Sequence, residues 1–238
     1  MSQSHRERVR EATLEEIKKV AKQQMRDEGT AAVSLRGIAN TMGMTAPAIY
    51  RYYARRDDLI TALIVDAYTA LGDAVISAFD ACPADDYAGR FYAGAQAYRA
   101  WGLAHPVDFG LIFGTPVPGY HAPPERTVPL VQRAFSPFIT TLQQACEKGL
   151  ARIPPEYDHA PQELHQRLSE WAASGSYNGL SIPVFHFSLT EWGLMHGLIA
   201  LEINGQLNPM AGQATNDLFN FEMKIMLNRL GLDTSSLT

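Results

Sequence analysis

The 238-residue sequence predicts an all-α fold, and three observations lead to this prediction. Apolar residues recur at three- and four-residue spacing, which is the periodicity of helices with one buried face. From Asp85 onward, no stretch shows the alternation of apolar and polar residues that is typical of half-buried strands. Proline and glycine fall between the apolar stretches, where helices end. We expect about nine helices or slightly more.

Composition and charge suit a globular protein with a basic N-terminal region. Apolar residues make up 46% of the chain and charged residues 19%, which are ordinary values for a globular domain. The formal net charge is −5, but residues 1–60 carry a net +3 and the remaining 178 residues a net −8. A local positive charge on an acidic body favours nucleic-acid contact at one end of the chain, because only nearby phosphates need neutralising.

The N-terminus predicts a cytoplasmic protein. It is charged and lacks the apolar core of a signal peptide. The longest apolar stretch, residues 59–79, is interrupted by Asp66 and Asp73, which argues against a membrane span. We therefore expect no membrane partner.

Sequence signals for catalysis and metal binding are missing. Cys82 and Cys146 are the only cysteines, and they form neither a CxxC motif nor a cluster with histidine. The chain also has no HExxH, GxSxG or GxGxxG motif. We therefore expect no catalytic residues, no cofactor and no metal site.

The most informative stretch is residues 33–59, which predicts two short helices joined by a tight turn. Ser34 can cap the first helix, whose apolar residues then share one face. Gly43 lies where the chain must turn sharply and supplies the necessary backbone freedom. Thr45 can cap the second helix, and Pro47 is tolerated in its first turn.

The second of these helices begins with small side chains. Ile49 and Tyr53 are four residues apart and point inward together. The outward-facing residues are then Ala46, Pro47, Tyr50 and Arg51. A helix that begins with small residues can enter a DNA major groove deeply, because nothing bulky holds it off the base edges. The pattern alone also fits an αα-hairpin inside a helical bundle.

Longer helices flank this stretch. Residues 6–28 predict a first helix with an apolar stripe, and a further helix opens at Arg56 and continues to about Asp80. Asp57 and Asp58 suit the positive N-terminal end of the helix that opens at Arg56, whereas Arg56 itself opposes the helix dipole there. Arg56 therefore needs another partner, for which a DNA phosphate is the obvious candidate.

This stretch resembles the helix-turn-helix motif of TetR-family transcriptional regulators. The matching residues are Leu35, Ile38, Ala39, Met42, Gly43, Met44, Thr45, Ile49, Tyr50, Tyr52, Tyr53, Arg56 and Leu59. The resemblance implies a three-helix DNA-binding domain over residues 1–56. It implies a helical ligand-binding and dimerisation domain over residues 57–238.

By analogy with the family, nine residues are predicted to contact double-stranded DNA at a palindromic operator. Those facing bases are Arg36, Ala46, Pro47, Tyr50 and Arg51, with Arg36 the best candidate for a bidentate guanine contact. Those holding phosphates are Ser34, Thr45, Tyr52 and Arg56. A homodimer would place two such sets in successive major grooves.

The body is predicted to hold a pocket for a small-molecule inducer. Expected helices cover residues 86–104, 107–113, 127–149, 161–173, 183–203 and 216–230, with loops over 114–124 and 174–181. The pocket is predicted near Trp101, His105, Phe109, Phe113 and Phe138, with loop 114–124 as a candidate lid. The implied inducer is small and mainly apolar or aromatic.

The last two long helices predict a dimer interface. The first is apolar nearly all round, and its Gly193 and Gly197 allow another helix to approach closely. Trp192, His196 and Gly197 resemble the tryptophan–histidine–glycine (WHG) signature of a TetR C-terminal subfamily. The predicted interface residues are Trp192, His196, Gly197 and Phe221.

These features predict a ligand-responsive DNA-binding regulator, a repressor that an inducer releases from its operator. One alternative is a dimeric DNA-binding protein without a small-molecule effector. A second alternative, a helical enzyme carrying the motif, requires a titratable pair in a cleft, and the sequence offers no such pair.

Overall fold

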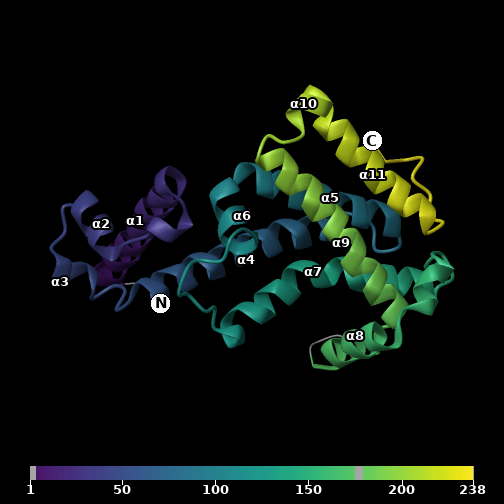
Figure 1. The fold of residues 1–238 in the computed structure, drawn as a ribbon, viewed down its shortest axis with the longest axis horizontal. Coiled ribbons are helices and arrows are strands. Elements are labelled where there is room, and N and C mark those ends of the chain that lie inside the picture. Colours follow the sequence, from purple (N-terminus) through teal and green to yellow (C-terminus); the bar gives the residue numbers. More distant parts are fainter. Residues whose placement is uncertain (1–3, 175–178, 238) are drawn as a thin grey trace. The chain divides into compact units, whose positions relative to one another are not determined.

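The computed structural model describes residues 4–174 and 179–237, and in these ranges it contains helices and no strand. The helices are α1 (His5–Glu28), α2 (Leu35–Thr41), α3 (Ala46–Ile49), α4 (Arg56–Asp80), α5 (Tyr87–Ala104), α6 (Pro106–Phe113), α7 (Pro124–Glu147), α8 (Gln162–Ser174), α9 (Ile182–Ile203), α10 (Asn208–Ala211) and α11 (Thr215–Arg229) (Figure 1). Short 3₁₀ turns cover Thr30–Ala32, Pro155–His159 and Gly212–Ala214. The predicted all-α class is confirmed.

Most predicted helices appear within a few residues of their expected bounds. The largest differences are α7, which begins at Pro124 instead of residue 127, and α10, which the sequence did not predict. Helix α10 has only four residues and carries a proline near its start, so it has no apolar period to recognise. The loop expected over 174–181 lies partly outside the described residues.

The chain forms two compact units. The N-terminal unit comprises Met1–Thr69 and His105–Leu130, and the second unit comprises Ala70–Ala104 and Val131–Thr238. The chain passes from one unit to the other within α4, between α5 and α6, and within α7. Helix α6 and the loop after it therefore belong with α1–α3.

The N-terminal unit has a continuous apolar core. Its fully buried residues include Ile17 of α1, Ile38 of α2, Ile49 of α3 and Leu59 and Leu63 of α4. An ion pair of 2.6 Å between Lys18 and Asp66 joins α1 to α4 at the edge of this core. Burial lowers the pKa of Lys18, but its hydrogen bonds to Asp66 and Glu15 outweigh this effect and raise the pKa above its ordinary value.

In the second unit, α5 packs against α9 and α11. The Arg99 guanidinium joins all three, because it donates to both carboxylate oxygens of Glu202 at 2.7 and 2.5 Å and to Asn216 at 2.8 Å. Tyr98 is fully buried, and its hydroxyl lies 2.8 Å from Nδ1 of His196. The Arg99 guanidinium fixes the relative positions of the three helices better than a single hydrogen bond would, because several donors act in one rigid group.

Helix α4 is long and apolar enough to cross a membrane by composition alone, and about 50% of its most apolar window is buried inside the protein. Its Leu63, Leu71 and Phe79 are core residues, and its Asp66 is paired with Lys18. These contacts are those of a core helix of a globular protein.

A carboxylate is buried between α9 and α11. Glu191 is 5% exposed, and its Oε1 lies 3.6 Å from Nη1 of Arg229. Its Oε2 is buried and has no hydrogen-bond partner. Burial raises the pKa of Glu191, an effect that Arg229 opposes and Glu222 reinforces.

The raised pKa of Glu191 predicts a pH-dependent stability. The folded state keeps this proton longer than the unfolded state, so stability is lost as pH rises from the unfolded pKa through the folded one. We expect Glu191→Gln to raise the free energy of unfolding at pH 7 by about 1 kcal/mol, or about 2–4 °C in melting temperature. The gain should shrink toward pH 4. Thermal melts of both proteins from pH 4 to 8 check this, and a gain independent of pH would contradict it.

Candidate nucleic-acid interface

The turn between α2 and α3 has the predicted geometry. The Oγ of Ser34 accepts a hydrogen bond from the Gly37 amide at 3.3 Å and so caps α2. Gly43 has φ +64°, a conformation that L side chains rarely adopt, and a Cβ there would meet nothing within 4 Å. The Met44 amide then donates to the carbonyl of Ala39 at 2.8 Å, which closes the turn.

A contact from α1 positions α2, and sequence reasoning did not find it. The side-chain oxygen of Gln24 accepts from the Ser34 amide at 3.3 Å. A Cβ on Gly37 would lie 2.6 Å from Nε2 of Gln24, so the Gln24 side-chain amide can occupy this position only because Gly37 has no side chain. Because Gln24 and Ser34 are ten residues apart, no local sequence pattern predicts this contact.

Helix α3 is short, with four residues and Pro47 in its first turn. Thr45 occupies the N-cap position, but its side chain makes no capping hydrogen bond. The inward face is confirmed, because Ile49 is fully buried and Tyr53 is 7% exposed. Burial raises the pKa of Tyr53.

Most residues predicted to contact DNA lie on the surface of the N-terminal unit. The exposed ones are Ser34, Arg36, Thr45, Ala46, Pro47, Tyr50 and Arg51. Tyr50 is the large hydrophobic residue among them, and its relative exposure is 46%. The structure therefore brings these seven residues together on α2, α3 and the turns beside them.

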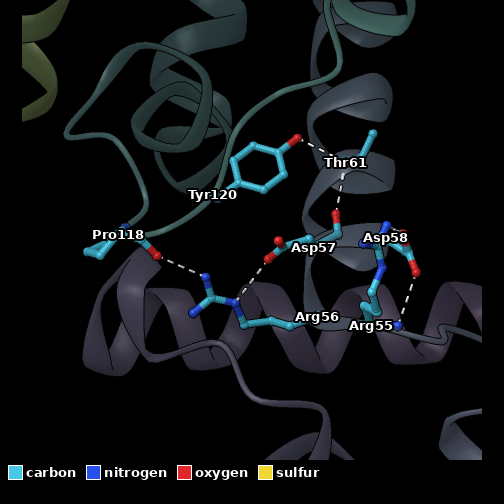
Figure 2. A network of polar contacts seen from close by, with 7 residues as sticks. All are labelled: Arg55, Arg56, Asp57, Asp58, Thr61, Pro118 and Tyr120. Carbon is cyan, nitrogen blue, oxygen red and sulfur yellow. Dashed lines mark hydrogen bonds and ion pairs between the residues drawn. The ribbon is translucent and has the colours of Figure 1, made fainter.

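The other two predicted DNA contacts, Tyr52 and Arg56, are half-buried. The guanidinium carbon of Arg10, on α1, lies 5.7 Å from the centre of the Tyr52 ring, a cation–π contact. The Arg56 guanidinium donates to the carbonyl of Pro118 at 3.0 Å and lies 3.5 Å from Asp57 (Figure 2). The chain itself thus supplies partners for a cation at a helix N-terminus, and the phosphate contact of Arg56 stays a prediction.

The residues predicted to bind a ligand divide between the two units. His105, Phe109 and Phe113 belong to α6 and its N-cap in the N-terminal unit, where the Phe109 and Phe113 rings are 5.1 Å apart. Trp101 and Phe138 belong to the second unit, where Phe138 packs on Phe79 and Phe91 with ring centres 5.0 Å apart in each pair.

The residues predicted at the dimer interface also fall into two groups. Trp192 and His196 contact residues of their own unit, since the Trp192 ring lies 5.5 Å from that of Phe135 and His196 bonds to Tyr98. Burial lowers the pKa of His196. In contrast, Phe221 is 63% exposed, and a Cβ on Gly197 would meet no atom within 4 Å.

Metal-ligand clusters and hollows in the surface would be other kinds of binding site in the described residues. Among them, no group of three or more His, Cys, Asp or Glu side chains is placed to hold a metal ion. An open apolar hollow of about 600 Å³ lies on α10 and α11. It is lined by Leu207, Met210, Ala211, Ala214, Asp217, Leu218 and Phe221, with one charged side chain among them.

Comparison with known proteins identifies the family. Residues 17–63 match the family described as bacterial regulatory proteins, tetR family, and residues 91–226 match the tetracyclin repressor-like, C-terminal domain. The chain belongs to the TetR family. The resemblance seen in residues 35–59 is thereby confirmed, and the helix-turn-helix described above lies inside the first matched region.

Individual relatives of this TetR-family chain are transcriptional regulators. The HTH-type transcriptional regulator Rv1816 of Mycobacterium tuberculosis is 36% identical over 198 residues, which are 83% of each chain. The HTH-type transcriptional regulator Mb1846 of Mycobacterium bovis matches with the same values. This TetR-family protein is therefore a DNA-binding transcriptional regulator and not an enzyme.

Solved structures agree with this assignment. The regulatory protein SCO4313 has a TM-score of 0.72 and 35% identity, and the match covers 94% of this chain and 100% of that one. A bacterial regulatory protein of the tetR family from Rhodococcus RHA1 has a TM-score of 0.62 with 14% identity, over 92% of this chain and 97% of that one. At that identity, the second match shows the shared fold alone.

The capping bond of Ser34 predicts separable effects on stability and DNA binding. We expect Ser34→Ala to lower the free energy of unfolding by about 1 kcal/mol, because it leaves the Gly37 amide without its acceptor. Ser34→Asp keeps an acceptor and should restore stability, while its negative charge should weaken DNA binding. Urea unfolding and DNA titration of both variants check this. Equal stability of Ser34→Ala and wild type would show that the cap contributes nothing.

Proposed function

We propose that this protein is a cytoplasmic, homodimeric repressor that a small, mainly apolar or aromatic inducer releases from a palindromic operator. Residues 1–56 read the DNA, and residues 57–238 bind the inducer and form the dimer. The observation that carries the DNA-reading part is the exposed surface of α2 and α3, where small residues precede Tyr50 and Arg51. Arg36 on α2 is then the candidate for guanine recognition.

The dimer part rests on apolar surface left uncovered on α9 and α11. The exposed large apolar residues there are Leu189, Leu194, Leu201, Phe221 and Ile225. A Cβ on Gly193 or Gly197 would meet no atom within 4 Å, so a partner helix can lie against the α9 backbone. A two-fold axis that pairs this surface with itself would bury it in a four-helix bundle. Trp192, His196 and Gly197 supply the WHG signature on the same helix.

The inducer part rests on aromatic residues in the body. Phe109 and Phe113 lie on α6 in the N-terminal unit, whereas Trp101 on α5 and Phe138 on α7 lie in the second unit. Trp101, Phe109 and Phe138 are buried, and buried aromatic side chains are typical of the lining of sites that bind apolar rings. His105 at the N-cap of α6 is exposed and adds a polar group. An inducer can shift the operator-binding equilibrium only by the difference in its affinity for the two states. The alternative, a dimeric DNA-binding protein without an effector, predicts that no such compound changes operator affinity.

The DNA-reading proposal predicts the outcome of a selection experiment. Selection of random duplex DNA by the purified protein should enrich a palindrome. Arg36→Ala should weaken binding by about 1–3 kcal/mol and relax the preference at one position of each half-site, because a bidentate guanine contact is lost. Tyr50→Ala should also weaken binding. Enrichment of a sequence without two-fold symmetry, or no effect of either variant, would contradict the proposal.

The dimer proposal predicts a selective effect of charge on α9. Gly197→Glu should fold but sediment as a monomer, because the new side chain has room in the protomer and obstructs the partner helix. The matched control is Gly110→Glu on α6, where a Cβ likewise meets nothing within 4 Å. Analytical ultracentrifugation of both variants checks this, and a Gly197→Glu dimer as stable as wild type would place the interface elsewhere.

A further inference from the structure

We propose that residues 114–123, named here the strap, orient Arg56 for contact with a DNA phosphate. Tyr120 and Thr61 then act as positioning residues for DNA binding. The inference rests on the proposed function, since it assumes that the N-terminal unit binds DNA. It concerns a loop that is more than fifty residues away from the helix-turn-helix in the sequence but belongs to the same compact unit.

The first observation is how the Arg56 guanidinium is held. Its Nη2 donates to the Pro118 carbonyl at 3.0 Å, and its Nε lies 3.5 Å from Oδ1 of Asp57 (Figure 2). The side chain is still 33% exposed. Among the described residues, the third nitrogen, Nη1, has no hydrogen-bond partner. One hydrogen bond and one ion pair therefore restrain the group, and its partly exposed side chain leaves Nη1 for an anion.

The second observation is how the strap is attached to α4. The Tyr120 and Thr61 hydroxyls are 2.9 Å apart, and the Thr61 hydroxyl donates to the Asp57 carbonyl at 2.8 Å. Because Thr61 has only one hydroxyl proton, Tyr120 is the donor in the first bond. Pro118 and Tyr120 thus bind α4 at two points, with Thr61 lying just over one turn after Arg56.

The strap has its own fixed shape. Val117 is buried, and its carbonyl accepts from the Tyr120 amide at 3.1 Å. Gly119, inside this turn, has φ +72°, which glycine adopts without strain. The turn therefore presents the Pro118 carbonyl and the Tyr120 hydroxyl together.

Holding Arg56 in this way has a physical consequence for DNA binding. A free arginine at a helix N-terminus opposes the helix dipole and loses rotamer freedom when it binds a phosphate. A guanidinium that is already held in place loses less rotamer freedom when it binds the phosphate, so the same contact gives stronger DNA binding. The neighbouring Arg55 shows the contrast: among the described residues its guanidinium is paired with Asp58 alone, and its side chain is 76% exposed.

The test is a double-mutant cycle on operator binding, using the full-length protein and the duplex that selection enriches. Tyr120→Phe should weaken binding about fivefold, the effect of losing one hydrogen bond of about 1 kcal/mol. Arg56→Ala should weaken binding and lower the salt dependence by about one phosphate contact per subunit. The double variant should bind no more weakly than Arg56→Ala. Thr61→Val should behave as Tyr120→Phe does.

Matched controls separate positioning from general stability. Tyr68→Phe removes a hydroxyl that bonds to the Ile112 carbonyl at 3.4 Å in the same unit, and it should leave operator affinity unchanged. Combining Tyr120→Phe with Arg55→Ala should give additive losses, because Arg55 does not touch the strap. Thermal melts of each variant verify that the fold is retained.

Two results would overturn the inference while leaving the proposed function standing. The first is that Tyr120→Phe matches wild type in affinity and salt dependence. The second is that Tyr120→Phe weakens binding equally with and without Arg56. Either result on an operator that wild type binds means that the strap does not act through Arg56. A wild-type protein that enriches no DNA overturns the proposed function and this inference together.

Discussion

The burial of two very short helices against α1 and α4 is the constraint on which the N-terminal unit depends. Helices of seven and four residues are not stable alone, because nucleation costs more than so few hydrogen bonds return. Ile38 and Ile49 must therefore be buried with Ile17 and Leu59, and all four have no exposed surface. Once these side chains point inward, the opposite sides of α2 and α3 must face solvent. The surface proposed to read DNA is thus a consequence of packing.

Polar contacts extend this unit beyond the N-terminal helices. Lys22 of α1 and Asp108 of α6 form an ion pair of 2.8 Å although 86 residues separate them. The second carboxylate oxygen of Asp108 is buried without a partner, so this pair bears an uncompensated desolvation cost. Arg56 and Pro118 are a further pair distant in sequence. Helix α6 is consequently bonded to α1, and the strap to Arg56 at the start of α4.

The second unit uses its polar residues differently. Arg99 joins α5, α9 and α11, while Tyr98 and His196 bond to each other in the interior. These contacts pair Glu202 and His196 of α9 with side chains of α5. The exposed residues of α9 are Leu189, Thr190, Gly193, Leu194 and Leu201, a mostly apolar set that suits a surface covered by another copy of the chain.

Features that depend on neighbours along the chain could be predicted from the amino-acid sequence alone. The helical class follows from the apolar period, the turn from Gly43, and the inward face of α3 from the four-residue spacing of Ile49 and Tyr53. These predictions hold because hydrogen bonding and side-chain direction within a helix are local. The family motif then assigned DNA contacts to the residues left outside.

Contacts that join distant segments could not be predicted in this way and are defined by the packing of the helices. No sequence pattern relates Gln24 to Gly37 or Arg56 to Pro118, because such contacts depend on how the helices pack and not on any period. For the same reason, the sequence did not show that the five predicted ligand residues divide between the units, with three in one and two in the other. Sequence spacing shows which face of a helix a residue occupies, but only the packed fold shows which other helix meets that face.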